Sequence, residues 1–274
     1  MGVTRPRRAA QATDDAVGPL VPRPPSSRCE VCVIIPVRDE AETLEAALDA
    51  LAHQVDVQGH RLERARYEIV VLANNCRDDS AGVARRFAVR DPTLALHVVE
   101  LALPPSRDHV GHARRLLMDE AYHRLRSLGR PRGVIASTDG DTRVAPDWIA
   151  ATLAEVARGV DAVGGRIALE PAGRAALELA ARAYHLRDVG YRHLVSEWAT
   201  YLDPEPWDPW PRHHQHFGAS LAVTAEAYGR AGGLPAVPAL EDVALYQALL
   251  RVDARVRHSP AVRVATSARR SSQT

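Results

Sequence analysis

Short apolar runs alternate with amphipathic segments over the first half of the chain. The runs are typical of buried β-strands and occupy residues 31–36, 67–72, 94–101 and 133–138. In the segments between them, apolar residues recur every three or four positions, which predicts helices with one buried face over residues 40–52, 79–90 and 111–128. Strands that alternate with helices in this way predict an α/β domain with a mainly parallel sheet and helices on both faces.

The pattern becomes less regular in the second half. It predicts strands over residues 160–169, 217–223 and 255–266, and helices over residues 147–156, 175–197, 224–231 and 241–252. Residues 201–210 are rich in proline and tryptophan and predict a loop built for contact. Gly164 and Gly165 interrupt a predicted strand, which indicates that a side chain there would obstruct a close neighbour.

The ends of the chain read differently from the domain between them. Residues 1–28 combine arginines and prolines with few apolar positions, so we expect a disordered N-terminal tail. We expect one domain over residues 29–270 and a short tail over residues 271–274.

Composition narrows the classes of partner. A formal net charge of +1 argues against a nucleic-acid-binding protein. The chain contains no lysine, so Schiff-base lysines and the phosphate-loop lysine are excluded. Three cysteines give no disulfide framework, and positions 29 and 32 enter a strand where residues three apart point to opposite faces, which disfavours a zinc or redox site. No apolar run approaches the ~20 residues that span a bilayer, so we expect no transmembrane segment and a cytoplasmic location.

Polar motifs follow the predicted strands. Residues 36–40 read Pro-Val-Arg-Asp-Glu, residues 74–79 read Asn-Asn-Cys-Arg-Asp-Asp, and residues 139–141 read Asp-Gly-Asp. Ligands of such sheets bind outside the carboxyl ends of the strands, where all three motifs fall. Two carboxylates one residue apart can hold Mg²⁺ or Mn²⁺ while substrate phosphates supply further ligands. A fourth motif, Glu241-Asp242, opens a predicted helix.

In this order the four motifs resemble the family 2 glycosyltransferases of the GT-A fold, over about residues 32–269. The resemblance implies transfer of a sugar from a UDP, GDP or dTDP donor to an unidentified small-molecule, glycan or lipid-linked acceptor. It also implies a divalent cation, Mg²⁺ or Mn²⁺, and inversion by direct displacement. It divides the domain into a nucleotide-binding half, about residues 29–145, and an acceptor-binding half, residues 146–270.

The resemblance also assigns roles to residues. Asp139 and Asp141 are expected to hold the metal, and Asp242 is expected to act as general base with Glu241 as a supporting acceptor contact. Asn74 stands where the family more often has aspartate, which leaves the base of the nucleotide open. The residues expected to bind the nucleotide sugar are Pro36, Val37, Arg38, Glu40, Asn74, Asn75, Asp79, Arg114, Asp139 and Arg269.

Histidines and tryptophans suggest the acceptor side. His214 and His216 would share a face of an extended segment, and Trp207 and Trp210 bracket the contact loop, so we expect weak acceptor contacts from these four residues. A tri-histidine zinc site is the alternative. Many relatives carry a metal-binding histidine near the last strand. This chain departs from that pattern, so Ser267 or Arg269 is expected to face the diphosphate, with His258 as an alternative ligand.

Other interpretations stay open. Acidic residues at positions 39–40 and 241–242 would also suit helix N-termini. A retaining transferase of the same fold, of the glucosyl-phosphoglycerate or mannosylglycerate synthase type, would share the first motifs. A catalytically inactive nucleotide-sugar-binding module would keep the same scaffold.

Overall fold

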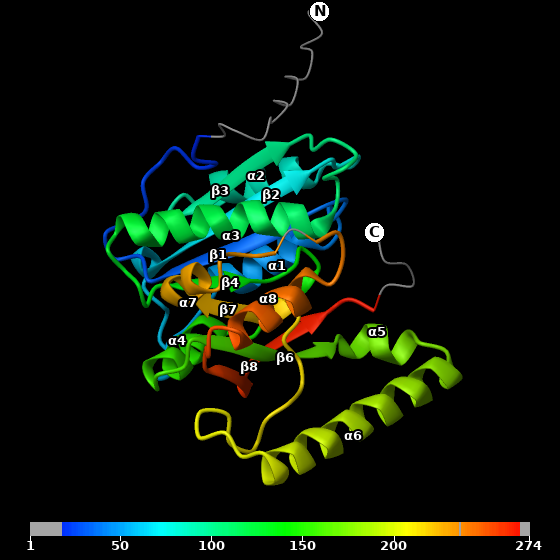
Figure 1. Ribbon diagram of the computed structural model, residues 1–274. Coiled ribbons are helices and arrows are strands. Elements are labelled where there is room, and N and C mark those ends of the chain that lie inside the picture. Colours follow the sequence, from blue (N-terminus) through cyan, green and yellow to red (C-terminus); the bar gives the residue numbers. More distant parts are fainter. Residues whose placement is uncertain (1–17, 236, 269–274) are drawn as a thin grey trace, which may run out of the picture.

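The computed structural model describes residues 18–235 and 237–268, which build one mixed sheet flanked by helices (Figure 1). Its strands are β1 Val31–Val37, β2 Tyr67–Asn74, β3 Leu96–Leu101, β4 Val134–Ser137, β5 Thr142–Val144, β6 Ala162–Leu169, β7 Leu221–Thr224 and β8 Val256–Thr266. Its α-helices are α1 Leu44–Ala52, α2 Ser80–Arg90, α3 Val110–Ser127, α4 Trp148–Ala157, α5 Pro171–Ala176, α6 Leu179–Leu202, α7 Ala225–Arg230 and α8 Glu241–Leu250. Short 3-10 turns lie at Arg64–Arg66 and Gly218–Ser220.

The strands follow the order β3-β2-β1-β4-β7-β6-β8-β5. The first four are parallel, β7 is antiparallel to both of its neighbours, and β8 runs parallel to β6. The expected α/β architecture with a mainly parallel, mixed sheet is therefore confirmed. At the far edge, β5 pairs Thr142 with Thr266, so the end of β8 lies beside the Asp-Gly-Asp motif.

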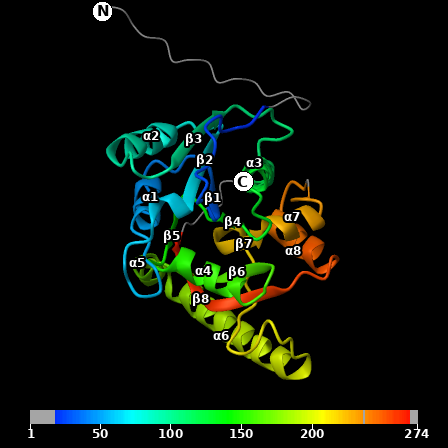
Figure 2. The same cartoon turned by 90° about the vertical axis from the view of Figure 1, so that its left-hand side faces the viewer.

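Successive side chains of the central strands point to opposite faces of the sheet, so they pack in two separate cores. Val33 and Ile35 pack in the core beneath α1, α2 and α4, whereas Cys32 and Ile34 pack in the core beneath α3, α7 and α8. Figure 2 shows these two layers on opposite sides of the sheet. Because both faces of β1 are covered, its sequence is apolar throughout rather than alternating.

The cysteine pair is part of this packing. Cys29 and Cys32 are both buried and unbridged, and burial raises the pKa of the Cys29 thiol to about 12. A thiol held protonated in this way is a poor metal ligand and a poor nucleophile.

Two observed elements differ from the expectation. The helix predicted over residues 175–197 is two helices, α5 and α6, because Leu177 and Glu178 have extended backbones. Strand β5 was not expected; its three residues have no period of their own and are ordered by pairing with β8.

Part of the expected N-terminal tail is packed. Residues 1–17 lie outside the described residues, but Val21 is buried against α3 in the second core. Nη1 of Arg124 donates to the carbonyl oxygens of Val21 and Arg23, at 3.2 and 2.8 Å, and the amide of Leu20 donates to Glu120 at 2.9 Å. A Pro-rich segment lacks amide donors but keeps its carbonyls, and a buried arginine can bind those.

Candidate active site

The turns that follow β1 and β2 are fastened to each other. Asp39 has a left-handed backbone (φ 55°), and its Oδ1 accepts a hydrogen bond from the amide of Arg77 at 2.5 Å. The amide of Glu40 donates to Oγ of Ser80 at 2.7 Å. These bonds hold the first two motifs at one edge of the sheet, as the sequence predicts.

The third motif joins them through its glycine. A Cβ atom at Gly140 would lie 3.1 Å from Cγ of Glu40, so the glycine allows the two turns to approach closely. On the other side, Ser267 Oγ donates to Oδ2 of Asp141 at 2.5 Å, and Thr266 lies nearby. Ser267 therefore lies next to the third motif, and Arg269 is outside the described residues.

Arg114 connects the third motif to the fourth. Its side chain is 5 % exposed, and its Nη2 donates to Oδ1 of Asp139 at 2.9 Å while its Nε donates to Oε1 of Glu241 at 3.1 Å. Nη1 donates to Oγ of Ser137 and to the carbonyl of Gly218. The carboxylates of Asp139 and Glu241 are thus separated by the width of one guanidinium. These donors are thus held by protein groups, whereas the sequence resemblance predicts that Arg114 binds the nucleotide sugar.

The two acidic residues that open α8 have different surroundings. Glu241 is buried and its carboxylate is paired with Arg114; its expected contact with the acceptor stays a prediction. Asp242 is partly exposed; its Oδ2 accepts from the amide of Gly218 at 3.0 Å and its Oδ1 accepts from the amide of Val243 at 2.8 Å. The preceding Leu240 has a left-handed backbone (φ 56°), which is unusual for a leucine and sets the direction in which α8 begins.

Some residues expected to bind the nucleotide have other partners. Arg38 pairs with Asp108, with Nη1 2.8 Å from Oδ1. Asn75 exchanges hydrogen bonds with the backbone of Leu103 and so ties β2 to the segment after β3. Asp79 is exposed and pairs with Arg86 of α2. Pro36, Val37 and Asn74 lie at the strand ends, where the sequence predicts them.

Asp139 and Asp141 offer an oxygen donor set that fits a hard divalent cation. Such cations commonly take one or two carboxylates and fill their remaining positions with phosphate oxygens and water. Among the His, Cys, Asp and Glu side chains of residues 18–235 and 237–268, only Asp39, Cys76 and Asp78 place three ligand atoms within 4.8 Å of one another, so no histidine, cysteine or further carboxylate joins the two aspartates in that way. His258, the alternative ligand, instead hydrogen-bonds Oδ2 of Asp208 at 2.9 Å.

A cavity of about 650 Å³ is lined by α6, the loop of residues 203–216, α8 and the start of β8. Asp242 and Tyr246 are one helical turn apart on α8, and the Tyr246 ring stacks on His216 with centroids 3.9 Å apart. His216 precedes Gly218, whose amide holds Asp242, by two residues. The expected acceptor residues His214 and His216 both line this cavity.

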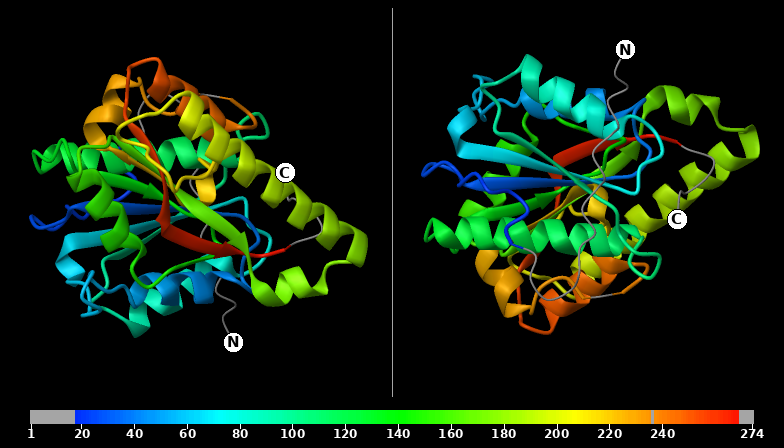
Figure 3. Two further views of the ribbon diagram at one scale, coloured as in Figure 1. Left: turned by 90° about the horizontal axis from the view of Figure 1, so that it is seen from below. Right: turned by 90° about the horizontal axis from the view of Figure 1, so that it is seen from above.

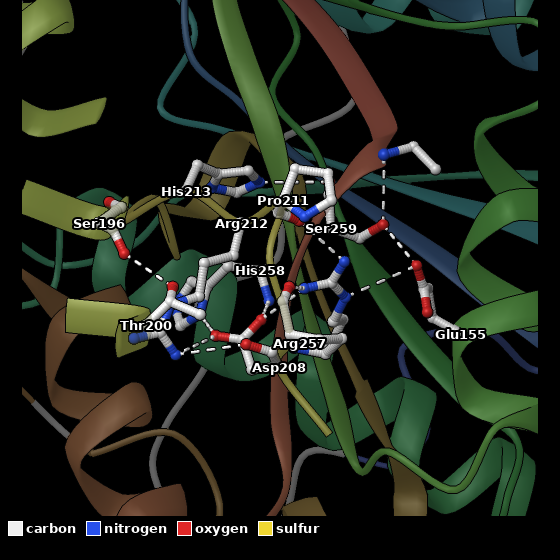
Figure 4. Close-up of polar contacts among 12 residues, drawn as sticks. Glu155, Ser196, Thr200, Asp208, Pro211, Arg212, His213, Arg257, His258 and Ser259 are labelled. Carbon is white, nitrogen blue, oxygen red and sulfur yellow. Dashed lines mark hydrogen bonds and ion pairs between the residues drawn. The ribbon is translucent and has the colours of Figure 1, made fainter. Parts of the chain in front are cut away.

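One buried carboxylate organises the cavity wall. Figure 4 shows Asp208 among Arg212, Arg257 and His258. Its Oδ1 accepts from Nη1 of Arg257 at 2.9 Å, and Arg212 lies 3.3 Å from Oδ2. Burial raises the pKa of Asp208, but its hydrogen bond to His258 and the charge of that ring outweigh burial, so the pKa is lowered and the carboxylate is ionised. Asp208 therefore pairs with both arginines that face it.

Three of the four histidines that line the cavity, His213, His214 and His216, are neutral at pH 7. Burial lowers the pKa of His213 to about 3 and that of His216 to about 4, and it also lowers the pKa of His214. The cavity is further lined by Arg212 and by four carboxylates, those of Asp203, Glu205, Asp208 and Asp253. Negative charge therefore predominates in it at neutral pH.

The two tryptophans expected on the acceptor side differ. Trp207 lines the cavity and lies under the guanidinium of Arg255, 5.8 Å from the ring centroid. Trp210 packs on His193 of α6 at 5.1 Å and helps to fix the loop.

Sequence reasoning missed three residues of this region. Gly218 provides the amide that holds Asp242, Tyr246 stacks on His216, and Asp208 orients His258. Of these three, only Tyr246 could have been found from the sequence, because a residue four positions after Asp242 on a predicted helix lies on the same helix face.

Comparisons with known proteins identify the family and the fold. The sequence profile described as "Glycosyl transferase family 2" matches residues 32–219. Glycosyltransferase AglE of Haloferax volcanii is 27 % identical over 138 residues, which cover 50 % of this chain and 39 % of AglE. The chain thus spans well under half the length of this relative.

Solved glycosyltransferase structures share the fold. The mannosyltransferase PcManGT of Pyrobaculum calidifontis, in complex with GDP-Man and Mn²⁺, has a TM-score of 0.59 at 22 % identity, over 92 % of this chain and 62 % of that one. TarS of S. aureus, in complex with UDP-GlcNAc, has a TM-score of 0.58 at 14 % identity, over 89 % and 60 % of the chains. Glucosyl-3-phosphoglycerate synthase of Mycobacterium tuberculosis, with Mn²⁺, UDP and phosphoglyceric acid, has a TM-score of 0.52 at 17 % identity, over 88 % and 72 %.

A search for membrane-spanning helices gave a negative result for the described residues: none combines the length and the apolarity that a bilayer crossing needs.

Proposed function

Since this chain belongs to glycosyl transferase family 2, we propose that it transfers a sugar from a nucleoside diphosphate donor to an acceptor hydroxyl, with a divalent cation and with inversion at the anomeric carbon. The observation that supports this proposal is that Arg114 joins Asp139 to Glu241 through two hydrogen bonds; we call this contact the Arg114 bridge. The Arg114 bridge leaves only the width of one guanidinium between the Asp-Gly-Asp motif and the N-terminus of α8, where Asp242 lies. Donor and acceptor groups thereby share one edge of the sheet.

On the donor side, Asp139 and Asp141 would hold Mg²⁺ or Mn²⁺, which would offset the negative charge that develops on the departing nucleoside diphosphate. Glu40 and Asn74 stand at the neighbouring strand ends and are assigned to the nucleoside. Similar folds in complex with GDP-Man, UDP or UDP-GlcNAc support a nucleotide-sugar donor without identifying its base. Arg114 becomes a positioning residue rather than a phosphate ligand, because its donors are held by protein groups.

On the acceptor side, Asp242 would accept the proton of the attacking hydroxyl as its oxygen bonds to the anomeric carbon and the bond to the diphosphate breaks. Both carboxylate oxygens accept backbone amides, which fixes the orientation of the group. A direct displacement of this kind gives an inverted product.

We assign the acceptor to the cavity lined by Tyr246, one helical turn from Asp242. The charge of the cavity indicates which chemical class of acceptor it can bind. Carboxylates outnumber arginines there and the histidines with lowered pKa values are uncharged, so we assign a neutral or cationic polyhydroxyl acceptor rather than a phosphorylated one. Tyr246 and Trp207 add aromatic faces on which a sugar ring can lie.

A donor screen followed by product analysis tests the proposal. UDP-, GDP- and dTDP-sugars are compared by thermal shift with and without Mn²⁺, and saturation by the right donor at 100 times its Kd should stabilise the protein by about 2.7 kcal/mol. Asp141→Asn should lose this shift. Asp147→Asn, an exposed aspartate paired with Arg263, is the matched control and should keep it.

Turnover separates the remaining alternatives. Asp242→Asn should keep donor stabilisation and lose about 10²–10⁴-fold in rate, as expected for a missing general base. A fully active variant would contradict the assignment. NMR of the product then gives its anomeric configuration: retention would favour the retaining alternative, and stabilisation without turnover by the unaltered protein would favour the inactive binding module.

A further inference from the structure

Helix α6 leaves most of its side chains uncovered. It is the longest helix of the described residues, 24 residues, and only Ser196 is buried along it. Figure 1 shows α6 below the sheet and the helices that cover it, and Figure 3 shows the same helix running out to α5 at one side of the molecule. Ser196 and Ala199 line the cavity, so the side of α6 opposite to them faces away from the rest of the chain.

That outward side is apolar and aromatic. It carries Tyr184, Arg187, Tyr191, Leu194, Trp198 and Tyr201, whose spacings alternate between three and four residues. We call these six residues the α6 stripe. The exposed fraction of its five apolar members runs from 56 % for Leu194 to 72 % for Tyr201. Three-four spacing is the spacing of a helix that pairs with another helix along its length.

The stripe is complementary to itself in one antiparallel register. If Tyr191 lies opposite Leu194 of a second copy, the same register places Arg187 opposite Trp198 and Tyr184 opposite Tyr201. Each of these pairs occurs twice, as a two-fold interface requires. A guanidinium over an indole ring is a favourable cation–π pair, so Arg187, which lies over the Tyr184 ring of its own chain at 5.9 Å, gains a second aromatic partner.

The available area is sufficient for a dimer. Aromatic side chains bury ~150–250 Å² each when covered, so four of them at their observed exposure, with Leu194, give on the order of 700 Å² per copy. A standard protein–protein interface buries about 800 Å² per partner. The 24 residues span roughly 36 Å, which is long enough for three layers of such pairs.

We propose that this face is a homodimer interface, in which α6 packs antiparallel on α6 of a second copy about a two-fold axis near Tyr191 and Leu194. The inner side of the same helix lines the acceptor cavity through Ser196 and Ala199. Dimer formation therefore also fixes one wall of that cavity.

A charge-rescue experiment tests the register as well as the dimer. The full chain is followed by sedimentation velocity over a wide concentration range. Tyr191→Arg and Leu194→Glu should each raise the dimer dissociation constant by at least ~100-fold, because each buries an unpaired charge. The double variant Y191R/L194E should restore the dimer, since the antiparallel register places each new arginine opposite a new glutamate.

Leu186→Glu is the matched control, because Leu186 is an exposed apolar position of α6 that lies off the stripe. It should leave the dimer intact. All three substituted positions are at the surface, and circular dichroism confirms that each of the four variants is folded.

Three results would overturn the proposal. The first is a protein that stays monomeric at every concentration, and the second is a dimer that the two single variants leave unchanged. The third is a double variant that remains monomeric like its parents. A monomer that instead co-floats with vesicles of phosphatidylcholine and phosphatidylglycerol would assign the α6 stripe to a membrane surface.

Discussion

Replacing Arg114 by methionine should destabilise the protein far more than removing a typical arginine. The substitution keeps most of the apolar stem of the side chain but removes the charge between two carboxylates. Glu241 then stays buried, with its side chain 7 % exposed, and has lost its cation. Removing one partner of a buried pair costs about 3–5 kcal/mol. Asp139 adds little to this cost because its side chain is one-third exposed and water can solvate it.

The assay is urea unfolding at neutral pH, extrapolated linearly to water. For a domain of this size the loss should lower the Tm by roughly 10 °C. The double variant R114M/E241Q removes the stranded charge as well. Its loss should therefore be smaller than the sum of the two single losses by about 2–3 kcal/mol.

Arg85→Met provides the control, because Arg85 pairs with Glu100 at the surface and both side chains are about half exposed. Its loss should not exceed about 1 kcal/mol. If Arg114→Met costs no more than this control, or if the double-variant losses simply add, the Arg114 bridge does not hold the two motifs together and the reasoning is refuted.

Three further predictions concern pH and packing. Burial raises the pKa of Glu68, but hydrogen bonds led by that of Arg124 outweigh it and bring the pKa to about 2, below the 4.5 of a free glutamate. About 3 kcal/mol of stability should therefore be present above pH 4.5 and lost as the pH falls toward 2. Measuring the unfolding free energy between pH 7 and pH 2 tests this. Glu68→Gln should lack this dependence of the unfolding free energy on pH. Burial lowers the pKa of His216 to about 4. As the pH falls from 6.5 toward 4, the unfolded chain therefore takes up a proton before the folded protein does, and the unfolding free energy should decrease. His216→Phe should flatten that part of the same titration curve, and an unchanged curve would argue against a buried neutral ring. A Cβ at Gly164 would lie 2.3 Å from the carbonyl oxygen of Gln215, so Gly164→Ala should cost about 1–3 kcal/mol in chemical denaturation and raise the acceptor KM more than the donor KM; equal effects on both constants would contradict a local role.

The obstruction at this strand was itself predicted from sequence. Two adjacent glycines inside an apolar run indicated a close neighbour, and the structure supplies it as the backbone of Gln215 at Gly164 and the side chain of Ser220 at Gly165. Sequence could not name these neighbours, because they lie about fifty positions away and reach β6 only through the folding of the sheet.

Local pattern determined the elements and the order of the motifs. Apolar runs and helical periodicity act over a few residues, so β1, β2 and α3 lie close to where the sequence predicts them. The same pattern placed the first three motifs at strand ends, and parallel topology then required them to share one edge.

Tertiary structure alone decided which partner each polar group found. Arg114 pairs across 127 positions with Glu241, and Asp208 pairs across 50 positions with His258. Neither choice has a local signal, because a buried charge selects whichever opposite group the topology brings within hydrogen-bond distance. Burial likewise separated Glu241 from Asp242, neighbours of the same type that sequence reasoning assigned to one task. The same reason applies to α6: its periodicity predicted a helix, but only the packed structure reveals that its aromatic side faces away from the core.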